Sequence, residues 1–531
     1  MSILNDVRMM ASYLKGLREY WQAPPNWHDA VGTIQTWMVE RQSAFERMLR
    51  VHIFGNPSSP YFRLMEAAGL TEARVCRMIR QDGVEGCLQQ LYEAGVYVTL
   101  DEFKGRRPIR RPNLEIPFTP HAFNVADLGS QLISHTGGSR SHGVATPIDV
   151  LDLMYELPAR YLFSRAYGLL DKPFILWRPA PPGAAGLRTA LRNAKLGMRA
   201  LRWFSPTRPN FSAASGKSAF VTAGTVLGSA MMGHAIPWPE YVPMDRPEVI
   251  ARFLAQEKAR GRFLQLDTMT SGAVLIAHAA KALGLDIRGH IVRVGGEPLT
   301  EAKAALFEEV GLGYCSQYAI AEVGSLGLSC KEASVPDDMH ILNYRSAIIQ
   351  QPKSLPGWPE PIGAIFLTFF SPRMTKVMLN VEVGDYGTME IRECGCPLGA
   401  AGLNVHLHTI RSYEKLTSVG MHFMGADLID ILESALPGRF GGGPGDYQFV
   451  EAEENGQTIL KLVVAPRVGP LEEKEVIGFV LSELERRTKS GRMMTDIWRD
   501  SRLLRLERAQ PYITRSAKVQ PLHVERKPER A

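Results

Sequence analysis

Apolar residues in the first part of the chain recur at intervals of three and four, which is the spacing of one face of an amphipathic helix. Residues that follow this spacing are Ile34, Met38, Phe45, Met48 and Leu49. Prolines interrupt it at positions 24, 25, 57 and 60, and proline breaks a helix because it lacks a backbone N–H. The pattern predicts a layer of helices over residues 1–110.

The pattern changes over residues 111–410, where short apolar runs alternate with helical periodicity. Runs with the length and composition of buried strands occupy residues 263–266, 291–294 and 364–370. Helical spacing follows at residues 272–285 and 299–310. Strands that alternate with helices pack as layers, so the chain predicts a large, multi-layer α/β domain with the helical layer at its N-terminus.

A smaller unit is expected over residues 411–531. Its pattern gives a helix near 426–435, a glycine-rich turn at 441–445, a hairpin over 447–465 and a helix over 471–487. No long low-complexity linker precedes it, so we expect a small α+β C-terminal domain that hinges directly on the large one.

Composition is that of a multidomain globular protein, with 531 residues of which 45% are hydrophobic. Six cysteines are too few for a disulfide framework, and the first twenty residues lack the apolar core of a secretion signal. These features predict a cytoplasmic protein. Residues 218–238 carry no charge but include glycines and a proline, so we expect buried strand and loop there and no transmembrane segment.

The formal charge of +6 is unevenly distributed, because residues 486–531 hold 13 Lys/Arg against 5 Asp/Glu. No nucleic-acid-binding motif accompanies these charges, so nucleic acid is not expected as a partner, and a basic lid over a polyphosphate explains them as well.

A second basic stretch has helical spacing over residues 187–202. Its cationic members are Arg188, Arg192, Lys195, Arg199 and Arg202. We expect a solvated face, and the alternatives are an anionic membrane, a carrier protein or the phosphates of CoA.

Six polar fragments follow one another between residues 136 and 518. The first is the small-residue loop Thr136-Gly137-Gly138-Ser139-Arg140-Ser141, whose uncovered N–H groups and hydroxyls suit phosphate oxygens. The others contain Gly296 and Glu297, Tyr318 and Glu322, Asp385, Arg411, and Lys518. Each fragment alone is a common turn, whereas their order is informative.

This order resembles the ANL superfamily of adenylate-forming enzymes, and within it the phenylacetate–CoA ligase-like and LuxE-like acyl-protein synthetase branches. The resemblance implies a large adenylation domain, a mobile C-terminal lid, and ATP with Mg²⁺ as ligands. It places the phosphates at Thr136, Gly137, Gly138 and Ser139, and Mg²⁺ at Glu322. It further places the nucleotide at Gly296, Glu297 and Tyr318, its ribose at Asp385 and Arg411, and negative charge in the transition state at Lys518.

The chain departs from the superfamily pattern at four positions. Arg140 stands near the usual lysine of the phosphate loop, Ala319 and Ala321 replace a glycine and a threonine, and Ala517 replaces the glycine before the catalytic lysine. The resemblance implies activation of a carboxylic acid as an acyl-adenylate and acyl transfer to CoA. The alternatives are transfer to the thiol of an acyl-accepting protein, and a homologue that has lost catalysis.

Cys330, His340, Cys394 and Cys396 offer the thiolate and imidazole ligands that a tetrahedral Zn²⁺ prefers. Their spacing is irregular, so scattered cysteines are the alternative. Some phenylacetate–CoA ligase-like enzymes carry a similar Cys…His…Cys-x-Cys cluster, which favours zinc. Four protein ligands leave no open position, so the ion is expected to be structural.

Overall fold

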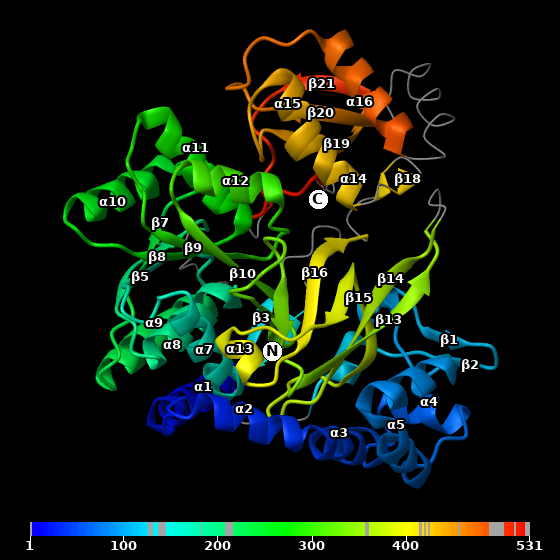
Figure 1. The fold of residues 1–531 in the computed structure, drawn as a ribbon. Coiled ribbons are helices and arrows are strands. Elements are labelled where there is room, and N and C mark those ends of the chain that lie inside the picture. The colour runs from blue at the N-terminus through cyan, green and yellow to red at the C-terminus, as the bar shows by residue number, and fades with distance from the viewer. Residues whose placement is uncertain are drawn as a thin grey trace.

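The protein is described from a computed structural model. The described residues are 3–125, 131–135, 145–181, 183–207, 216–355, 360–413, 417–418, 421–422, 425–454, 457–487, 504–514 and 517–525. Figure 1 shows a large body, coloured blue to yellow, and a smaller part above it, coloured orange to red. The predicted class, a layered α/β domain with a smaller α+β unit, is confirmed.

Helices form the N-terminal layer, as the periodicity predicts. They are α1 (Ile3–Gln22), α2 (Ala30–Val39), α3 (Arg41–Leu49), α4 (Pro60–Ala67), α5 (Glu72–Glu93) and α6 (Leu100–Phe103). The predicted breaks occur where expected, because residues 24–25 separate α1 from α2 and Pro60 is the first residue of α4. The side chains of Asp29, Ser59, Thr71 and Thr99 cap four of these helices at their N-termini.

A twelve-stranded sheet runs through the large body in the order β13-β14-β15-β16-β12-β11-β10-β9-β8-β5-β6-β7. Its parallel strands are β5 (Phe174–Trp177), β6 (Ala200–Ser205), β7 (Pro239–Tyr241), β8 (Gln265–Thr268), β9 (Ile291–Gly295) and β10 (Gly313–Ile320). Its antiparallel strands are β11 (Gly324–Ser329), β12 (Met339–Ile341), β13 (Ser346–Lys353), β14 (Ile362–Phe369), β15 (Met378–Ile391) and β16 (Val405–Ser412). The change from parallel to antiparallel pairing falls between β10 and β11.

Helices cover both faces of the parallel half. One face meets α10 (Glu248–Ala259), α11 (Thr270–Leu283) and α12 (Glu301–Glu309), and the other meets α1, α8 (Ala184–Lys195) and α9 (Gly216–Met231). In β5, Ile175 and Trp177 join the first cluster while Phe174 and Leu176 join the second. Because β5 is buried on both faces, each of its four residues is apolar, and the strand reads as a continuous apolar run in the sequence.

Two predictions about helices are wrong. Residues 218–238 are expected as buried strand and loop, but helix α9 (Gly216–Met231) covers most of them. The basic stretch expected as a solvated helical face over 187–202 is divided in the structure. Arg188, Arg192 and Lys195 on α8 are at most 8% exposed, whereas Arg199 and Arg202 lie beyond the end of the helix and are exposed. Lys195 Nζ donates to the carbonyls of Trp21 and Ala23, each at 2.9 Å. Within the described residues, no helix combines the length and apolar character needed to cross a bilayer.

The smaller part has its own apolar cluster and a four-stranded sheet in the order β21-β20-β19-β22. Its strands are β19 (Tyr447–Glu454), β20 (Gln457–Val464), β21 (Leu504–Arg508) and β22 (Leu522–Val524), and its helices include α14 (Gly425–Asp430), α15 (Leu436–Phe440) and α16 (Glu473–Arg487). The predicted hairpin and both predicted helices are present. Strand β16 of the large sheet continues to Ser412, next to the expected boundary.

Candidate functional site

A cavity of about 210 Å³ lies between the large body and the smaller part. The predicted site residues that line it are Gly296, Glu297, Tyr318, Asp385, Arg411 and Lys518. They come from loops and strands separated by more than two hundred residues, so only the fold brings them together. Thr136, Gly137, Gly138 and Ser139 lie outside the described residues, between β3 (Gln131–His135) and β4 (Ala145–Asp149) in the sequence, and these two strands pair antiparallel.

Contacts across this cavity hold the smaller part against the large body. Glu433 forms an ion pair with Lys303 at 2.6 Å and accepts a hydrogen bond from the Thr300 hydroxyl. His278 Nε2 lies 3.0 Å from the carbonyl oxygen of Pro444. Glu433 and Lys303 are both at most 9% exposed, so the contact between them is shielded from water and is stronger than it would be at the surface.

Lys518 reaches the loop that contains Gly296. A β-carbon on Gly296 would lie 3.4 Å from Lys518 Nζ and 3.1 Å from Met269 Cε, and the φ angle of Gly296 is +83°. The conformation favours glycine, and a β-carbon there would touch the flexible ends of the Met269 and Lys518 side chains. Beyond the lysine, the Val519 N–H donates to Ser271 Oγ at 3.4 Å, which ties this segment to the start of α11.

Ala517 occupies the position where the resemblance implies glycine. Its φ is +60°, a left-handed conformation that costs alanine about 1 kcal/mol. The turn is closed by hydrogen bonds from Ala517 N to Thr514 O and from Thr514 N to Lys518 O, each at 2.8 Å. Ala517 therefore adopts the left-handed conformation that glycine would adopt at this position, directly before Lys518.

Tyr318 and Asp385 meet on the opposite wall. The Tyr318 hydroxyl donates to Asp385 Oδ2 at 2.8 Å. Burial, followed by the neighbouring Asp385 carboxylate, raises the pKa of Tyr318 well above its ordinary value, so the phenol stays a neutral donor. Asp385 follows Gly384, whose φ of +82° permits the bend that turns the carboxylate toward the cavity.

Arg411 is positioned by a residue that the sequence reasoning missed. Asp337 accepts from Arg411 Nη1 at 3.0 Å and also from the backbone N–H groups of Thr409 and Ile410 at 3.0 and 3.2 Å. Thr409 has a φ of +54°, which explains why this strand end needs a carboxylate brace. No local pattern around Asp337 reveals this role, because its partners lie more than seventy residues away.

Glu297 has a structural contact that the resemblance does not imply. Its Oε2 accepts from the Ser271 N–H at 2.8 Å, so its charge lies at the N-terminus of α11, where the helix dipole favours it. Its Oε1 is buried and has no hydrogen-bond partner among the described residues. One oxygen thus anchors the loop, and the other remains for a ligand.

Glu322 does not line the main cavity. It borders a separate space of about 10 Å³ together with Arg188, Arg373 and Asp149, which is room for about one water molecule. Glu322 lies in the turn between β10 and β11, four residues after Tyr318. Its assignment to Mg²⁺ stays a prediction.

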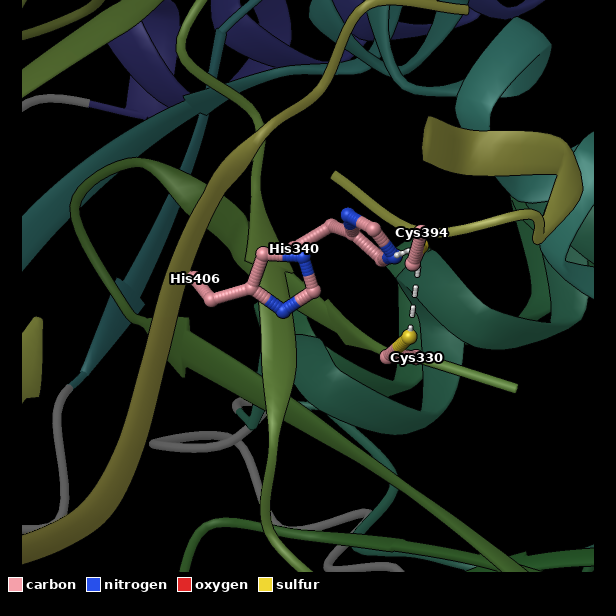
Figure 2. Close-up of side chains that lie close together, drawn as sticks. All are labelled: Cys330, His340, Cys394 and His406. Atoms are coloured by element: carbon pink, nitrogen blue, oxygen red, sulfur yellow. Dashed lines mark hydrogen bonds between the residues drawn. The ribbon is translucent and has the colours of Figure 1, made fainter. Parts of the chain in front are cut away.

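A cluster of cysteine and histidine side chains lies around β12, the strand that contains His340. Figure 2 shows Cys330, His340, Cys394 and His406 with their side chains together, and one ligand atom from each lies within 4.8 Å of all the others. The Sγ atoms of Cys330 and Cys394 are 3.7 Å apart, and Cys394 Sγ is 3.5 Å from His340 Nε2. Tetrahedral zinc with its usual bond lengths would separate two sulfurs by about 3.8 Å and sulfur from nitrogen by about 3.6 Å, so these three donors fit.

Two residues offer the fourth donor. The predicted Cys396 has its Sγ 3.0 Å from His340 Nε2. The hydrogen bond from the Cys330 thiol lowers the pKa of Cys396 to about 2, and the same contact raises the pKa of Cys330. His406, which the sequence reasoning missed, pairs with His340 across β12 and β16.

The histidines are oriented as metal ligands are. His340 Nδ1 lies 2.5 Å from the Leu403 carbonyl oxygen, which only accepts, so its Nε2 is left as an acceptor facing the cysteines. His406 Nδ1 lies 2.8 Å from Asp338 Oδ1, and its Nε2 is buried without a hydrogen-bond partner in the described part of the chain. Carbonyl and carboxylate partners of this kind fix metal-binding imidazoles.

No protein-family profile and no curated protein matches the chain. Solved structures do resemble it. A 2-hydroxyisobutyryl-CoA ligase in complex with 2-HIB-AMP and CoA is 13% identical, with 92% of this chain and 91% of that chain covered and a TM-score of 0.44. ATP-bound MatB from Rhodopseudomonas palustris is 12% identical, with 73% and 66% covered and a TM-score of 0.40.

A third is MenE from Bacillus subtilis in complex with ATP and magnesium, which is 13% identical, with 65% and 62% covered and a TM-score of 0.39. These enzymes are adenylate-forming ligases, the superfamily that the motif order resembles. Their TM-scores lie below 0.5, so this likeness does not assign an activity to the chain.

Proposed function

We propose that the protein is an ATP-dependent ligase of the adenylate-forming superfamily. It activates a carboxylic acid as an acyl-adenylate with release of pyrophosphate, and then transfers the acyl group to a thiol. The observation that carries this proposal is the convergence of Tyr318, Asp385, Arg411 and Lys518 on one cavity between the two parts of the chain.

Each of these side chains has chemistry that suits a nucleotide. The ionised Asp385 accepts hydrogen bonds from the ribose hydroxyls, while Tyr318 holds that carboxylate in place through its hydroxyl. Arg411, braced by Asp337, supplies a fixed cation on the same side. Lys518 enters from the smaller part and neutralises negative charge as the carboxylate oxygen bonds to the α-phosphorus and the bond to pyrophosphate breaks.

The superfamily also implies Mg²⁺, for which Glu322 is the predicted ligand and the 136–139 loop the predicted phosphate cradle. Magnesium, when bound, would neutralise phosphate charge. CoA is the acceptor we propose. Its thiol sulfur would bond to the acyl carbon of the adenylate as the bond to AMP breaks. We place the reaction in the cytoplasm, where thiols such as those of the cysteine cluster remain reduced.

We further propose that Zn²⁺ binds Cys330, His340 and Cys394, with Cys396 or His406 as the fourth ligand. Zinc would join the segment after β11 to the segment between β15 and β16. Asp337 immediately precedes Asp338, which orients His406, so the zinc site would also stabilise the brace of Arg411. Its role is structural, because no position is left for a substrate.

The test is ATP–pyrophosphate exchange with a panel of acids, using the wild type and Lys518→Ala. We expect exchange with at least one acid and a loss of about 100-fold or more in the variant, since removal of one charge-stabilising group costs that much. Lys474→Ala, an exposed lysine on α16 in the same part, is the matched control.

Exchange that survives in Lys518→Ala would refute the role of this lysine. Tight ATP binding without exchange for any acid would refute the ligase and favour a homologue that has lost catalysis. Once an acid is known, mass spectrometry separates the acceptors: an acyl-CoA supports CoA, whereas an acylated protein in the presence of CoA supports the LuxE-like alternative.

A further inference from the structure

A layer of buried arginines separates α8 and α7 (Leu157–Ala166) from the central strands. The layer, which we call the arginine layer, consists of Arg160, Arg178, Arg188, Arg192, Arg293 and Arg345 with the carboxylates Asp152, Glu156 and Asp267. None of the nine is more than 8% exposed. Six cations therefore face three anions, and ionised groups buried without counterions are costly.

The carboxylates are already shared among the other arginines. Glu156 pairs with Arg192 and lies 3.9 Å from Arg188. Asp267 pairs with both Arg178, at 2.6 Å, and Arg293, at 2.9 Å.

Arg345 takes the remaining acid and Arg160 has none. Arg345 pairs with Asp152 at 2.5 Å. Arg160 donates only to neutral oxygens, those of Gln317 Oε1 and of Ser325 Oγ at 2.6 Å, and no ion pair reaches it within the described residues. Burial, followed by the neighbouring Arg192, lowers the pKa of Arg160 well below its ordinary value, although Glu156 and Asp267 act in the opposite direction.

Several N–H groups of the layer also lack acceptors. Among the described residues, the buried nitrogens without a hydrogen-bond partner include Arg160 Nε, Arg178 Nη2, Arg188 Nε, Arg293 Nη1 and Arg345 Nε. Folded proteins rarely leave buried donors unsatisfied. Unsatisfied guanidinium donors together with an excess of positive charge are the features of a site for an anion.

The arginine layer lies directly behind the nucleotide cavity. Gln317 lines that cavity and accepts the hydrogen bond from Arg160. Arg178 Nη1 contacts Met269 Sδ at 2.7 Å, and Met269 Cε lies 3.1 Å from the β-carbon position of Gly296, beside Lys518. Gln317 therefore connects the arginine layer to the cavity, and Met269 contacts Arg178 on one side and the loop of Gly296 on the other; both side chains are unbranched, and methionine in particular repacks readily.

We propose that the acid that this enzyme activates carries a second anionic group, a second carboxylate, and that this group binds in the arginine layer at Arg160 and Arg178. The inference rests on the proposed ligase function and adds the substrate class. One carboxylate lies at Lys518 and reacts, while the other passes Gln317 and Met269 and supplies the missing counterion. A monocarboxylic acid of the same length would leave Arg160 unpaired.

The test compares acids that differ only in the distal charge: succinate with butanoate, and glutarate with its monoamide. Pyrophosphate exchange is measured for the wild type, for Arg160→Leu and for the control Arg202→Leu, whose arginine is exposed and pairs with Glu240. We expect kcat/KM for the diacids to exceed that for the uncharged partners by at least about tenfold, and Arg160→Leu to abolish this preference, as loss of a charged hydrogen bond implies.

The same acids are added without ATP while thermal unfolding is followed. Diacids should raise the midpoint of the wild type and of Arg202→Leu but not of Arg160→Leu. Exchange that is equal or better with monoacids would overturn the inference and leave the ligase function intact. A midpoint raised by diacids in an enzyme that exchanges with no acid would support the anion site and refute the ligase. If the protein shows no pyrophosphate exchange with any acid and no rise of the unfolding midpoint with diacids, both the anion site and the ligase function are refuted. Should Arg160→Leu fail to fold, the wild-type comparison of acids alone decides.

Discussion

Glu156 is the central anion of the arginine layer, and replacing it with glutamine tests how that layer is balanced. The carboxylate is fully buried, accepts a hydrogen bond from Ser325 Oγ at 2.6 Å, and pairs with Arg192. Burial by itself would raise its pKa, but Arg192 and Arg188 outweigh burial and lower the pKa well below the ordinary value. Glutamine keeps the shape and removes the charge.

The expected loss is about 3–5 kcal/mol in the free energy of unfolding, the usual cost of removing one partner from a buried ion pair. This is a large share of the roughly 5–15 kcal/mol that stabilises a typical domain. Glu240→Gln is the matched control, because Glu240 pairs with Arg202 at 2.6 Å but both side chains are nearly half exposed. An exposed pair of this kind contributes at most about 1 kcal/mol.

Urea unfolding at pH 7, followed by tryptophan fluorescence, measures the difference, since Trp177 and Trp203 are buried in the same part of the sheet. The folded pKa of Glu156 is lowered, so its contribution is complete above the unfolded pKa of about 4.3 and declines as the pH falls below it. The difference in the free energy of unfolding between the wild type and Glu156→Gln should therefore be largest near neutral pH and become smaller in acid. A loss at pH 7 no greater than that of Glu240→Gln would refute the reasoning.

Three further predictions concern the cavity and the cluster. Gly296→Ala should reduce pyrophosphate exchange by about tenfold, because alanine resists the left-handed φ of this loop and its β-carbon would lie against Met269 Cε and the end of the Lys518 side chain. The strain of about 1–2 kcal/mol should leave the protein folded in thermal unfolding, and unchanged exchange would contradict the placement of this loop beside the lysine. Asp337→Asn should raise the KM for ATP by about tenfold, because the neutral amide binds the Arg411 guanidinium more weakly. An unchanged KM would refute the role of Asp337 in positioning Arg411. Elemental analysis should find zinc in the wild type and in Cys76→Ser, whose cysteine lies outside the cluster, but not in Cys394→Ser. Equal metal content in the two variants would refute the zinc site.

The alternation of strands and helices could be predicted because it follows from burial on one or two faces, but helix α9 could not. Its glycines suggest a loop when they are read along the sequence. In the structure Gly224 and Gly228 lie one turn apart on the face that meets α1, where β-carbons would approach Leu14 and Leu17 to 3.1 and 3.2 Å. The glycines permit close packing of two helices, and that partner lies about two hundred residues away.

The site residues that the sequence predicts depend on local backbone requirements, whereas those it misses depend on partners that are distant in the sequence. Gly296 follows the end of β9 and Gly384 lies within β15, and the positive φ of each is a local requirement, so the motifs around them are recognisable in the sequence. Asp337 and His406 act through strand register and long-range contacts. Their signals are an ordinary acidic turn and a histidine in a strand, which carry no information until the strands are paired.

Helix α8 shows why charge periodicity alone predicts the wrong environment. Arg188 and Arg192 lie one turn apart, which is as typical of a solvated face as of a buried one. The environment that forms depends on whether other elements supply anions and hydrogen-bond acceptors. Here Glu156 at the start of α7 supplies the anion, and the Ser325 hydroxyl on β11 accepts a hydrogen bond from Arg192. The chain supplies too few anions to balance Arg160. Because sequence selection seldom maintains an uncompensated buried charge without a use, the missing anion is better sought in the substrate than in the protein.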